Sequence, residues 1–510
     1  MSISKTFSAQ LSGLKAHIIN IEVDLSNGLH AFVVVGLGDK AVEESRDRIS
    51  AAIKNSGYTS PKQKNQKVVI SLAPADIRKE GPSFDLGMAL AYLCASGDID
   101  FDPSKKIFLG ELSLEGEIRK VNGILPLVSG ALENGFKEIF IPWENAEEAG
   151  LVQGIKIYPV HTLNEVIGHL IGRNGSSIVP QNKTKIEMGH EIFESNFKLI
   201  QGQETAKRAL EIAAAGGHNV GMYGPPGTGK TMLAKAFPTI LPPLLMNEVL
   251  EVTSIHSIAK ILEKSFITTP PFRSPHHTSS YASLVGGGSF PKPGEITLAH
   301  RGVLFLDEFP EFDKKVIEAL RQPLEERTIT ISRVKGTISF PAQCILIVSM
   351  NPCPCGYGKE KNCTCTDRDI SNYQKRISGA IVDRIDLWVS VSKIEYDKLG
   401  ESSNKNEDSS VIRERVMKAR NIQKKRFIKF KIKNKKFNSE MSVSDIEKCI
   451  SLDLEVKNLL KTSAERLALS ARAYHRIIKL SQTIADLDGS KEIKKNHLLE
   501  ALQYRQKNFQ

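Results

Sequence analysis

The pattern of hydrophobic and polar positions divides the chain into three structured blocks separated by two polar segments. Residues 1–172 mix short apolar runs of strand length with helical stretches. In residues 189–399 helical patterns alternate with short apolar runs, which favours a parallel α/β sheet. Residues 411–510 have helical periodicity, which is typical of a helical lid. Residues 173–188 and 400–410 are rich in Gly, Ser and Asn, so we expect them to be linkers.

Several elements can be located from the same pattern. Strands are predicted at residues 31–36, 68–72, 138–142 and 344–349, and helices at residues 40–56 and 84–96. In the last block the predicted packing face consists of apolar residues at helical spacing: Ile412, Val416, Ala419, Leu467, Ala471, Tyr474 and Ile478.

The length of 510 residues suggests two to four domains. The composition, with 41% hydrophobic and 25% charged residues, is that of a globular protein and excludes a disordered, collagen or coiled-coil chain. No run of about 18 apolar residues occurs, and the start lacks a signal-peptide pattern, so we expect a soluble, cytoplasmic protein without a membrane span. Four of the seven cysteines lie between residues 353 and 365. In a reducing compartment such crowding favours a metal over disulfides.

The formal net charge of +11 permits a polyanionic partner without proving one, because a lysine-rich solvated surface gives the same excess. The excess is concentrated: residues 411–436 contain twelve basic residues and one acid, Glu414. The apolar spacing of this segment predicts that one face packs while its charges are solvated. A peripheral, salt-sensitive contact with DNA is the functional alternative.

A phosphate-binding loop is predicted between a strand and a helix, from the motif Gly224, Pro225, Pro226, Gly227, Thr228, Gly229, Lys230 and Thr231. Glycines at these positions let backbone N–H groups close on the phosphates of ATP. Lys230 is expected to reach the β- and γ-phosphates, and the Thr231 hydroxyl to ligate Mg²⁺.

Polar residues follow two further apolar strands. The run from Gly302 to Leu306 ends in two acids, of which Asp307 is expected to bind the metal and Glu308 to activate the attacking water. The predicted strand at 344–349 is followed by Asn351, whose side chain is expected between that water and the γ-phosphate, as in the first sensor of AAA+ ATPases.

The order of these motifs resembles one family of proteins. The P-loop is followed by FLDEF at 305–309, SMNPCPCG at 349–356, YQKRISGAIVDRIDLWV at 373–389 and LSARAYHRIIKLSQTIADL at 469–487. This order is similar to that of the YifB/ComM group of magnesium-chelatase-like AAA+ proteins. The resemblance implies an AAA+ core with a C-terminal helical lid and a ring-forming ATPase, in some members a hexameric DNA helicase that promotes branch migration in recombination and natural transformation.

The resemblance also implies roles for arginines. Arg384 is the candidate arginine finger that completes the site of a neighbouring subunit, with Arg376 as the alternative, and Arg472 matches the second sensor. A finger acting between subunits implies an oligomer. The β-branched runs around 334–336 predict a hairpin, and the resemblance places its tip residues Arg333 and Lys335 in the pore as contacts to DNA phosphates.

The crowded cysteines have the spacing Cys353-x-Cys355-x₇-Cys363-x-Cys365. Four thiolates suit a tetrahedral structural zinc, although the spacing is tighter than in a usual zinc knuckle and free thiols are the alternative. A catalytic zinc is not expected, because four thiolates leave no open position.

The first block resembles Lon-type proteases, in which a Gly-Pro-Ser segment carries the nucleophile. Here Ser83 follows Gly81 and Pro82, but the position of the activating lysine is Leu125. A serine hydroxyl is a weak nucleophile without a nearby base. The resemblance therefore implies a Lon-like α+β domain of the ribosomal S5 domain 2 type, without protease activity, that binds DNA or helps a ring to assemble.

Three functions are compatible with these features. The first is an Mg²⁺-ATP-driven motor on single-stranded or branched DNA. The second is a chelatase-type motor subunit that remodels a protein partner; the chain shows no Asp-x-Ser-x-Ser partner motif. The third, an ATP-dependent protease, is disfavoured by Leu125.

Overall fold

A computed structural model describes residues 3–186, 195–288, 291–333, 336–358, 363–393 and 406–505. The chain forms two compact units: residues 1–187 with 246–267, and residues 188–245 with 268–510. Among the described helices, none combines the length and the apolar character that crossing a membrane requires.

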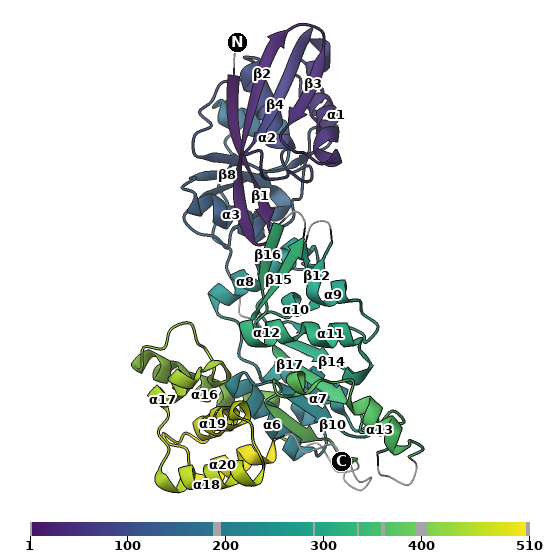
Figure 1. Cartoon of the computed structure of the whole chain (residues 1–510). Coiled ribbons are helices and arrows are strands. Elements are labelled where there is room, and N and C mark those ends of the chain that lie inside the picture. The colour runs from purple at the N-terminus through teal and green to yellow at the C-terminus, as the bar shows by residue number, and fades with distance from the viewer. Residues whose placement is uncertain are drawn as a thin grey trace. The chain divides into compact units, whose positions relative to one another are not determined.

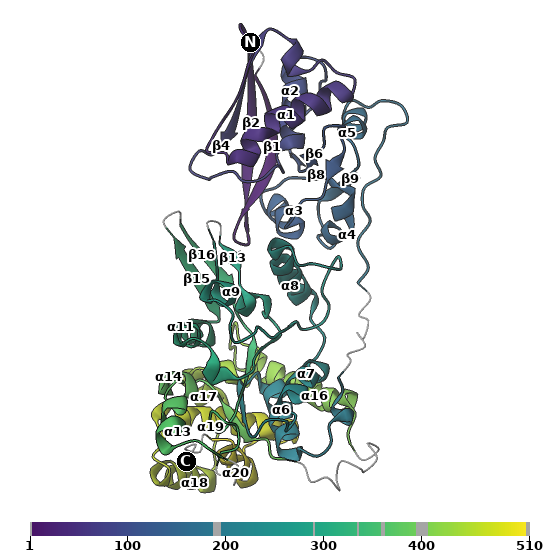
Figure 2. The same cartoon turned by 90° about the vertical axis from the view of Figure 1, so that its right-hand side faces the viewer.

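The first unit contains a four-stranded sheet in the order β1-β2-β4-β3. All four strands are labelled in Figure 1, and β1, β2 and β4 also in Figure 2. Its strands are β1 (Ile3–Ser12), β2 (Lys15–Asn27), β4 (Gln66–Ala73) and β3 (Ala31–Val35). Neighbours are antiparallel except β3 and β4. Helices α1 (Lys40–Asn55) and α2 (Asp85–Ala95) pack against this sheet. Alternate residues of β4, Val68, Ile70 and Leu72, are buried, as the period of two requires.

A second, parallel sheet of the first unit has the order β5-β8-β9. These strands are β5 (Lys106–Phe108), β8 (Glu138–Pro142) and β9 (Lys156–Val160), with helices α3 (Ile124–Glu133), α4 (Ala146–Ala149) and α5 (Leu163–Leu170) and a small hairpin of β6 (Glu111–Leu112) and β7 (Ile118–Arg119). The unit is thus a mixture of helices with parallel and antiparallel strands. The strands predicted at 31–36, 68–72 and 138–142 and the helices predicted at 40–56 and 84–96 are confirmed.

A segment from the middle of the chain completes the first unit. Helix α8 (Met246–Ala259) packs against α3. The Ser257 hydroxyl accepts a hydrogen bond of 3.0 Å from the Gly123 N–H and is also bonded to Glu148, whose pKa is raised by burial. Residues 246–267 therefore lie in the first unit, whereas the sequence analysis assigned them to the 189–399 domain. Their helical pattern indicates a helix but not the body against which it packs.

The second unit is built on a parallel five-stranded sheet in the order β11-β14-β17-β10-β18. Strands β14, β17 and β10 are labelled in Figure 1. Its strands are β11 (Phe272–Arg273), β14 (Val303–Leu306), β17 (Ile345–Met350), β10 (Val220–Tyr223) and β18 (Leu387–Ser390). Helices α6 (Glu204–Gly216) and α7 (Lys230–Ala236) flank β10. Every residue of β14 and β17 is buried, which explains their uninterrupted apolar sequences. The parallel α/β sheet predicted for this region is confirmed.

Shorter elements surround this sheet. The helices are α9 (Tyr281–Val285), α10 (Glu295–Leu298), α11 (Lys314–Ala319), α12 (Arg321–Glu326), α13 (Asp367–Gln374) and α14 (Gly379–Val382), and the paired strands are β12 (Gly286–Gly287) with β13 (Lys292–Pro293) and β15 (Thr328–Arg333) with β16 (Gly336–Pro341).

In the described residues 406–505, five α-helices form the C-terminal lid: α16 (Ser409–Lys429), α17 (Val443–Cys449), α18 (Leu454–Arg466), α19 (Ala471–Leu487) and α20 (Lys495–Gln503). Ile412, Val416 and Ala419 are buried on α16, as predicted. Of the second predicted face, Ile478 is buried and Tyr474 packs against the core, as predicted. The prediction was wrong for Ala471, which is exposed because the helix breaks between α18 and α19, and Leu467 is half-buried at that break. The linker predicted at 400–410 lies largely outside the described residues, and the described part of the one predicted at 173–188 continues the first unit.

Candidate nucleotide site

The turn between β10 and α7 has the backbone that a phosphate-binding loop needs. Gly227 and Gly229 have φ of +74° and +91°, which favour glycine. At Gly224 a Cβ would lie 2.0 Å from the Val391 carbonyl oxygen, so only glycine fits at this close approach. The Thr228 hydroxyl donates a 2.9 Å hydrogen bond to the Pro225 carbonyl and closes the turn.

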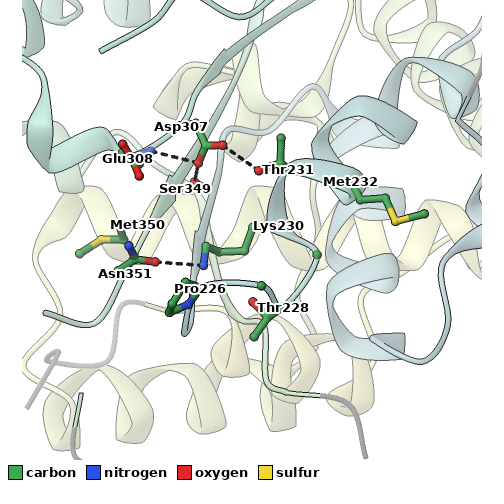
Figure 3. A pocket seen from close by; sticks show the side chains of 12 residues that line it. Pro226, Thr228, Lys230, Thr231, Met232, Asp307, Glu308, Ser349, Met350 and Asn351 are labelled. Atoms are coloured by element: carbon green, nitrogen blue, oxygen red, sulfur yellow. Dashed lines mark hydrogen bonds between the residues drawn. The ribbon is translucent and has the colours of Figure 1, made fainter. Parts of the chain in front are cut away.

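Lys230 lies inside this turn. Its Nζ donates hydrogen bonds of 2.7 Å to the carbonyls of Gly224 and Pro225. It also donates one of 3.2 Å to Asn351 Oδ1 (Figure 3). Burial of the ammonium lowers the pKa of Lys230, and the negative charges of Asp307 and Glu308 partly oppose this shift. The ammonium is thus fixed between the P-loop and the end of β17.

The two predicted carboxylates follow β14. Asp307 Oδ2 accepts a 2.7 Å hydrogen bond from the Thr231 hydroxyl, and its Oδ1 accepts one from Ser349 on β17. A hydroxyl and a carboxylate so close together form the oxygen donor set that Mg²⁺ prefers. The residues present therefore fit the predicted Mg²⁺ site.

Glu308 adopts a left-handed backbone with φ of +51°, which is uncommon outside glycine. Its carboxylate is exposed, and Oε2 lies 3.4 Å from Nδ1 of His277. The pairing of His277 with Glu308 could not be read from the sequence, because 31 residues separate the two. His277 links the segment after β11 to the carboxylate expected to activate water.

These residues enclose one pocket of about 430 Å³. Its lining consists of Pro226, Gly227, Thr228, Gly229, Lys230, Thr231, Met232, Asp307, Glu308, Ser349, Met350 and Asn351. The volume lies within the range of small-molecule sites, about 300–1,000 Å³. The structure thus brings together the P-loop and the side chains of Asp307, Glu308 and Asn351, and adds Ser349, which sequence reasoning did not single out.

Two of the predicted arginines lie elsewhere. Arg384 and Arg472 do not line this pocket; both donate to Oε1 of Glu325, at the end of α12. The pKa of Glu325 is lowered to about 2, mainly by the hydrogen bond from Arg384 and next by the one from Arg472. Its carboxylate is therefore charged at neutral pH. Sequence reasoning missed Glu325 because its partners lie 59 and 147 positions away.

The turn that presents Arg384 is held from two sides. Asp386 accepts a 3.1 Å hydrogen bond from the Asn219 N–H, which precedes β10. From the lid, Arg476 donates bonds of 2.9 and 2.8 Å to the carbonyls of Asp383 and Ile385. Arg376, the alternative finger, instead pairs with Glu311 at 2.5 Å.

The four predicted cysteine ligands converge beyond the end of β17. Their sulfur atoms all lie within 4.8 Å of one another, and that of Cys353 lies 3.2 Å from Cys355 and 3.8 Å from Cys363. With zinc–sulfur bonds of about 2.3 Å, the edges of a regular tetrahedron are about 3.8 Å. The thiols therefore fit a tetrahedral metal site.

The predicted DNA contacts are described only in part. Strands β15 and β16 form the predicted hairpin, with Arg333 opposite Gly336, while Lys335 lies outside the described residues. On the basic helix α16, Arg415 pairs with Glu211 and Glu407, and Arg420 bonds the Ala214 carbonyl. The exposed basic residues of α16 are Lys418, Lys424, Lys425 and Lys429.

In the first unit, the positions compared with Lon proteases have different environments. Leu125 is fully buried in the first turn of α3, and its N–H donates to Glu148 at 3.3 Å. Ser83 is half-buried, immediately before Phe84 and the start of α2.

The P-loop follows β10, and polar residues follow β17 and β14, the next two strands in the sheet. This arrangement in a parallel sheet defines an AAA+ nucleotide-binding fold. Comparison with known proteins agrees. Residues 196–399 match the family "Magnesium chelatase, subunit ChlI", residues 21–145 match "Subunit ChlI of Mg-chelatase", and residues 406–505 match "Magnesium chelatase, subunit ChlI C-terminal".

Two of the similar proteins cover nearly the whole chain, and a third covers about a third of it. "Competence protein ComM" of Haemophilus influenzae is 41% identical over 99% of this chain and 98% of its own length. "Uncharacterized protein YifB" of Escherichia coli is 38% identical over 99% and 97%. "DNA replication licensing factor mcm2" of Xenopus tropicalis is 25% identical over 36% of this chain and 20% of its own length. The chain belongs to the YifB/ComM family of magnesium-chelatase-like AAA+ proteins.

Proposed function

We propose that this protein is an Mg²⁺-dependent ATPase that forms a ring, moves along DNA and promotes branch migration during homologous recombination or natural transformation. The observation that supports the ATPase is the convergence of Lys230, Asp307, Glu308 and Asn351 on one pocket at the carboxyl edge of the sheet. Thr231 and Asp307 would hold the Mg²⁺, which neutralises charge on the β- and γ-phosphates when it is bound. Glu308 orients and deprotonates the attacking water.

The positions of the arginines support the oligomer. Arg384 and Arg472 lie outside the pocket of their own chain and are paired on Glu325. A phosphoryl-transfer site gains strongly from an arginine that meets the developing charge. We therefore assign Arg384 to the pocket of a neighbouring subunit, and the resemblance to ring-forming relatives favours a hexamer.

The DNA partner rests on relatives and on charge. The relatives include a competence protein and, over 36% of this chain, a DNA replication licensing factor. The described part of the β15–β16 hairpin ends in the pair Arg333 and Gly336. We propose that Arg333 and Lys335 contact DNA phosphates in the pore without reading sequence. The exposed lysines of α16 supply a second, salt-sensitive contact.

DNA is expected to stimulate hydrolysis, because a motor couples ATP turnover to movement. The ATPase rate should rise at least about threefold, well above assay scatter, with single-stranded or forked DNA, and stimulation should fall steeply with salt. A labelled four-way junction should separate into arms with ATP and not with a non-hydrolysable analogue. A variant with Lys335→Ala should lose stimulation while keeping the basal rate. An assembled ring that neither responds to DNA nor moves a junction contradicts the DNA motor.

A chelatase-type motor that remodels a protein partner is the second candidate, because the three matching families are described as magnesium chelatase subunits. This function predicts ATPase activity that DNA does not change. The stimulation experiment therefore separates the two candidates.

For the first unit we propose a Lon-like domain that binds and does not cleave. Leu125 replaces the activating lysine and is buried, so Ser83 has no base at that position. We expect no ATP-dependent cleavage of casein or of a fluorogenic peptide, and an Ser83→Ala variant should be indistinguishable from the wild type. Cleavage that Ser83→Ala abolishes would restore the protease candidate.

For the cysteines we propose one structural Zn²⁺ bound by Cys353, Cys355, Cys363 and Cys365. The sulfur separations support this assignment. The site is structural rather than catalytic, because four thiolates saturate a tetrahedral ion.

A further inference from the structure

The cysteine ligands belong to a short segment that we call the knuckle, residues 352–358 and 363–365. Within the knuckle, the Gly358 N–H donates to the Cys353 sulfur at 3.2 Å and the Cys355 N–H donates to the Cys365 sulfur at 3.4 Å. Such N–H donors stabilise thiolates and orient metal ligands. Binding one ion to all four sulfurs would therefore fix the backbone of the knuckle as well.

The knuckle contacts the P-loop. Gly356 has φ of +90°, and a Cβ at this position would lie 2.9 Å from Cδ of Pro226, closer than real Cβ atoms approach. Pro226 lines the nucleotide pocket. The backbone of the knuckle at Gly356 therefore lies directly against the loop that surrounds the phosphates.

The knuckle is also joined to Asn351, which lies two residues before Cys353. Asn351 accepts from Lys230 through its side chain, and its backbone is hydrogen bonded to the phenol of the buried Tyr373. Only Pro352 separates Cys353 from Asn351, so a displacement of Cys353 would also displace Asn351. The hydrogen bond between Asn351 and Lys230 depends on the position of Asn351.

A third contact joins the knuckle to the chain after β18. Nζ of Lys393, just after β18, lies 5.7 Å from the ring centre of Tyr357. This distance is within the range of a cation–π interaction. The knuckle thus touches the chain after β10, β17 and β18, which are neighbours in the sheet.

We propose that the zinc-bound knuckle is a brace for the ATP site: the metal fixes the spacing between Pro226 and Asn351, and thereby the position of Lys230. The inference rests on the ATP and zinc sites proposed above. Without the metal, four unligated thiols no longer hold the knuckle together, and both Pro226 and Asn351 lose a rigid neighbour. The consequence is weaker nucleotide binding, not merely lower thermal stability.

The test compares two double variants. Cys363→Ser with Cys365→Ser removes two ligands that lie outside the segment joining Asn351 to Gly356. Cys94→Ser with Cys449→Ser removes two thiols outside the cluster and is the matched control. Zinc content is measured by mass spectrometry, folding by circular dichroism, and the Kd for a fluorescent ATP analogue with Mg²⁺ by titration.

We expect about one zinc per chain in the wild type and in the control pair. The ligand variant should hold less than about a tenth of this and bind the nucleotide about tenfold more weakly, the scale of effects from residues that support a site. If the ligand variant fails to fold, the wild type treated with a zinc-selective chelator in excess Mg²⁺ supplies the same comparison, and re-addition of zinc should restore the Kd.

Different outcomes distinguish a failure of the proposed zinc and nucleotide sites from a failure of the brace. A wild type without zinc, or without nucleotide binding, overturns the sites proposed above. A wild type that has both, with a zinc-free form whose Kd and ATPase rate are unchanged, leaves those sites intact and overturns the brace. Gly356→Ala gives an independent check: the added methyl meets Pro226, so the Kd should rise while zinc content stays near one. A Gly356→Ala protein that keeps its zinc and its Kd contradicts the brace.

Discussion

Replacement of Glu308 by glutamine is expected to leave ATP bound and to stop its hydrolysis. The amide keeps the shape of the side chain at the pocket edge but cannot accept a proton from water. Loss of a general base typically costs about 10²–10⁴ in rate, so kcat should fall at least about a hundredfold. Lys230→Ala should instead abolish binding, because it removes the ammonium that lies between the P-loop carbonyls and Asn351. Titration with a fluorescent nucleotide and a phosphate-release assay separate the two effects.

Glu318→Gln is the matched control for this pair. It removes the same charge on α11, where Glu318 pairs with Arg321 at 2.7 Å and does not line the pocket. Its Kd and kcat should equal those of the wild type. A Glu308→Gln protein that hydrolyses ATP at the wild-type rate would show that another group activates the water, and His277, 3.4 Å from Glu308, would be examined first.

The nucleotide site could be predicted largely from the sequence, because its residues follow strands in a fixed local order. Lys230 and Thr231 belong to one contiguous motif, and Asp307 and Glu308 directly follow an apolar strand. In a parallel sheet such strand ends meet at one edge, so their proximity follows from the fold class. The same reasoning does not give Ser349, whose hydroxyl reaches Asp307 from the neighbouring strand.

Long-range partners could not be predicted, because no local pattern records them. Glu325 lies on a short helix next to a second acid, Glu326, and only the fold places Arg384 and Arg472 beside it. Helix α8 has an unremarkable helical sequence, yet it packs in the first unit through Ser257. The cysteine spacing predicts a metal cluster, but the contact between Gly356 and Pro226 depends on tertiary structure.

Arg384→Ala is expected to lower kcat by at least about a thousandfold with little change in ATP affinity. An arginine finger contributes about 10³–10⁵ in rate, since it meets charge that develops only in the transition state. Because the pKa of Glu325 is lowered to about 2, its carboxylate keeps Arg384 paired throughout the neutral range, and the ratio of wild-type to variant kcat should be constant from pH 6 to pH 8. Arg376→Ala, at the arginine paired with Glu311, is the matched control and should keep most of the activity.

An experiment with mixed subunits tests whether Arg384 acts in the pocket of its own chain or in that of a neighbouring subunit. Rings of Arg384→Ala alone and of Glu308→Gln alone should both be inactive. In mixed rings, a Glu308→Gln subunit supplies an intact Arg384 to the intact pocket of an Arg384→Ala neighbour, so part of the ATPase activity should return. Mixed rings without any recovery would mean that Arg384 serves its own chain, and that its separation from the pocket must close by a rearrangement within one subunit. A large loss with Arg376→Ala and none with Arg384→Ala would instead identify Arg376 as the finger.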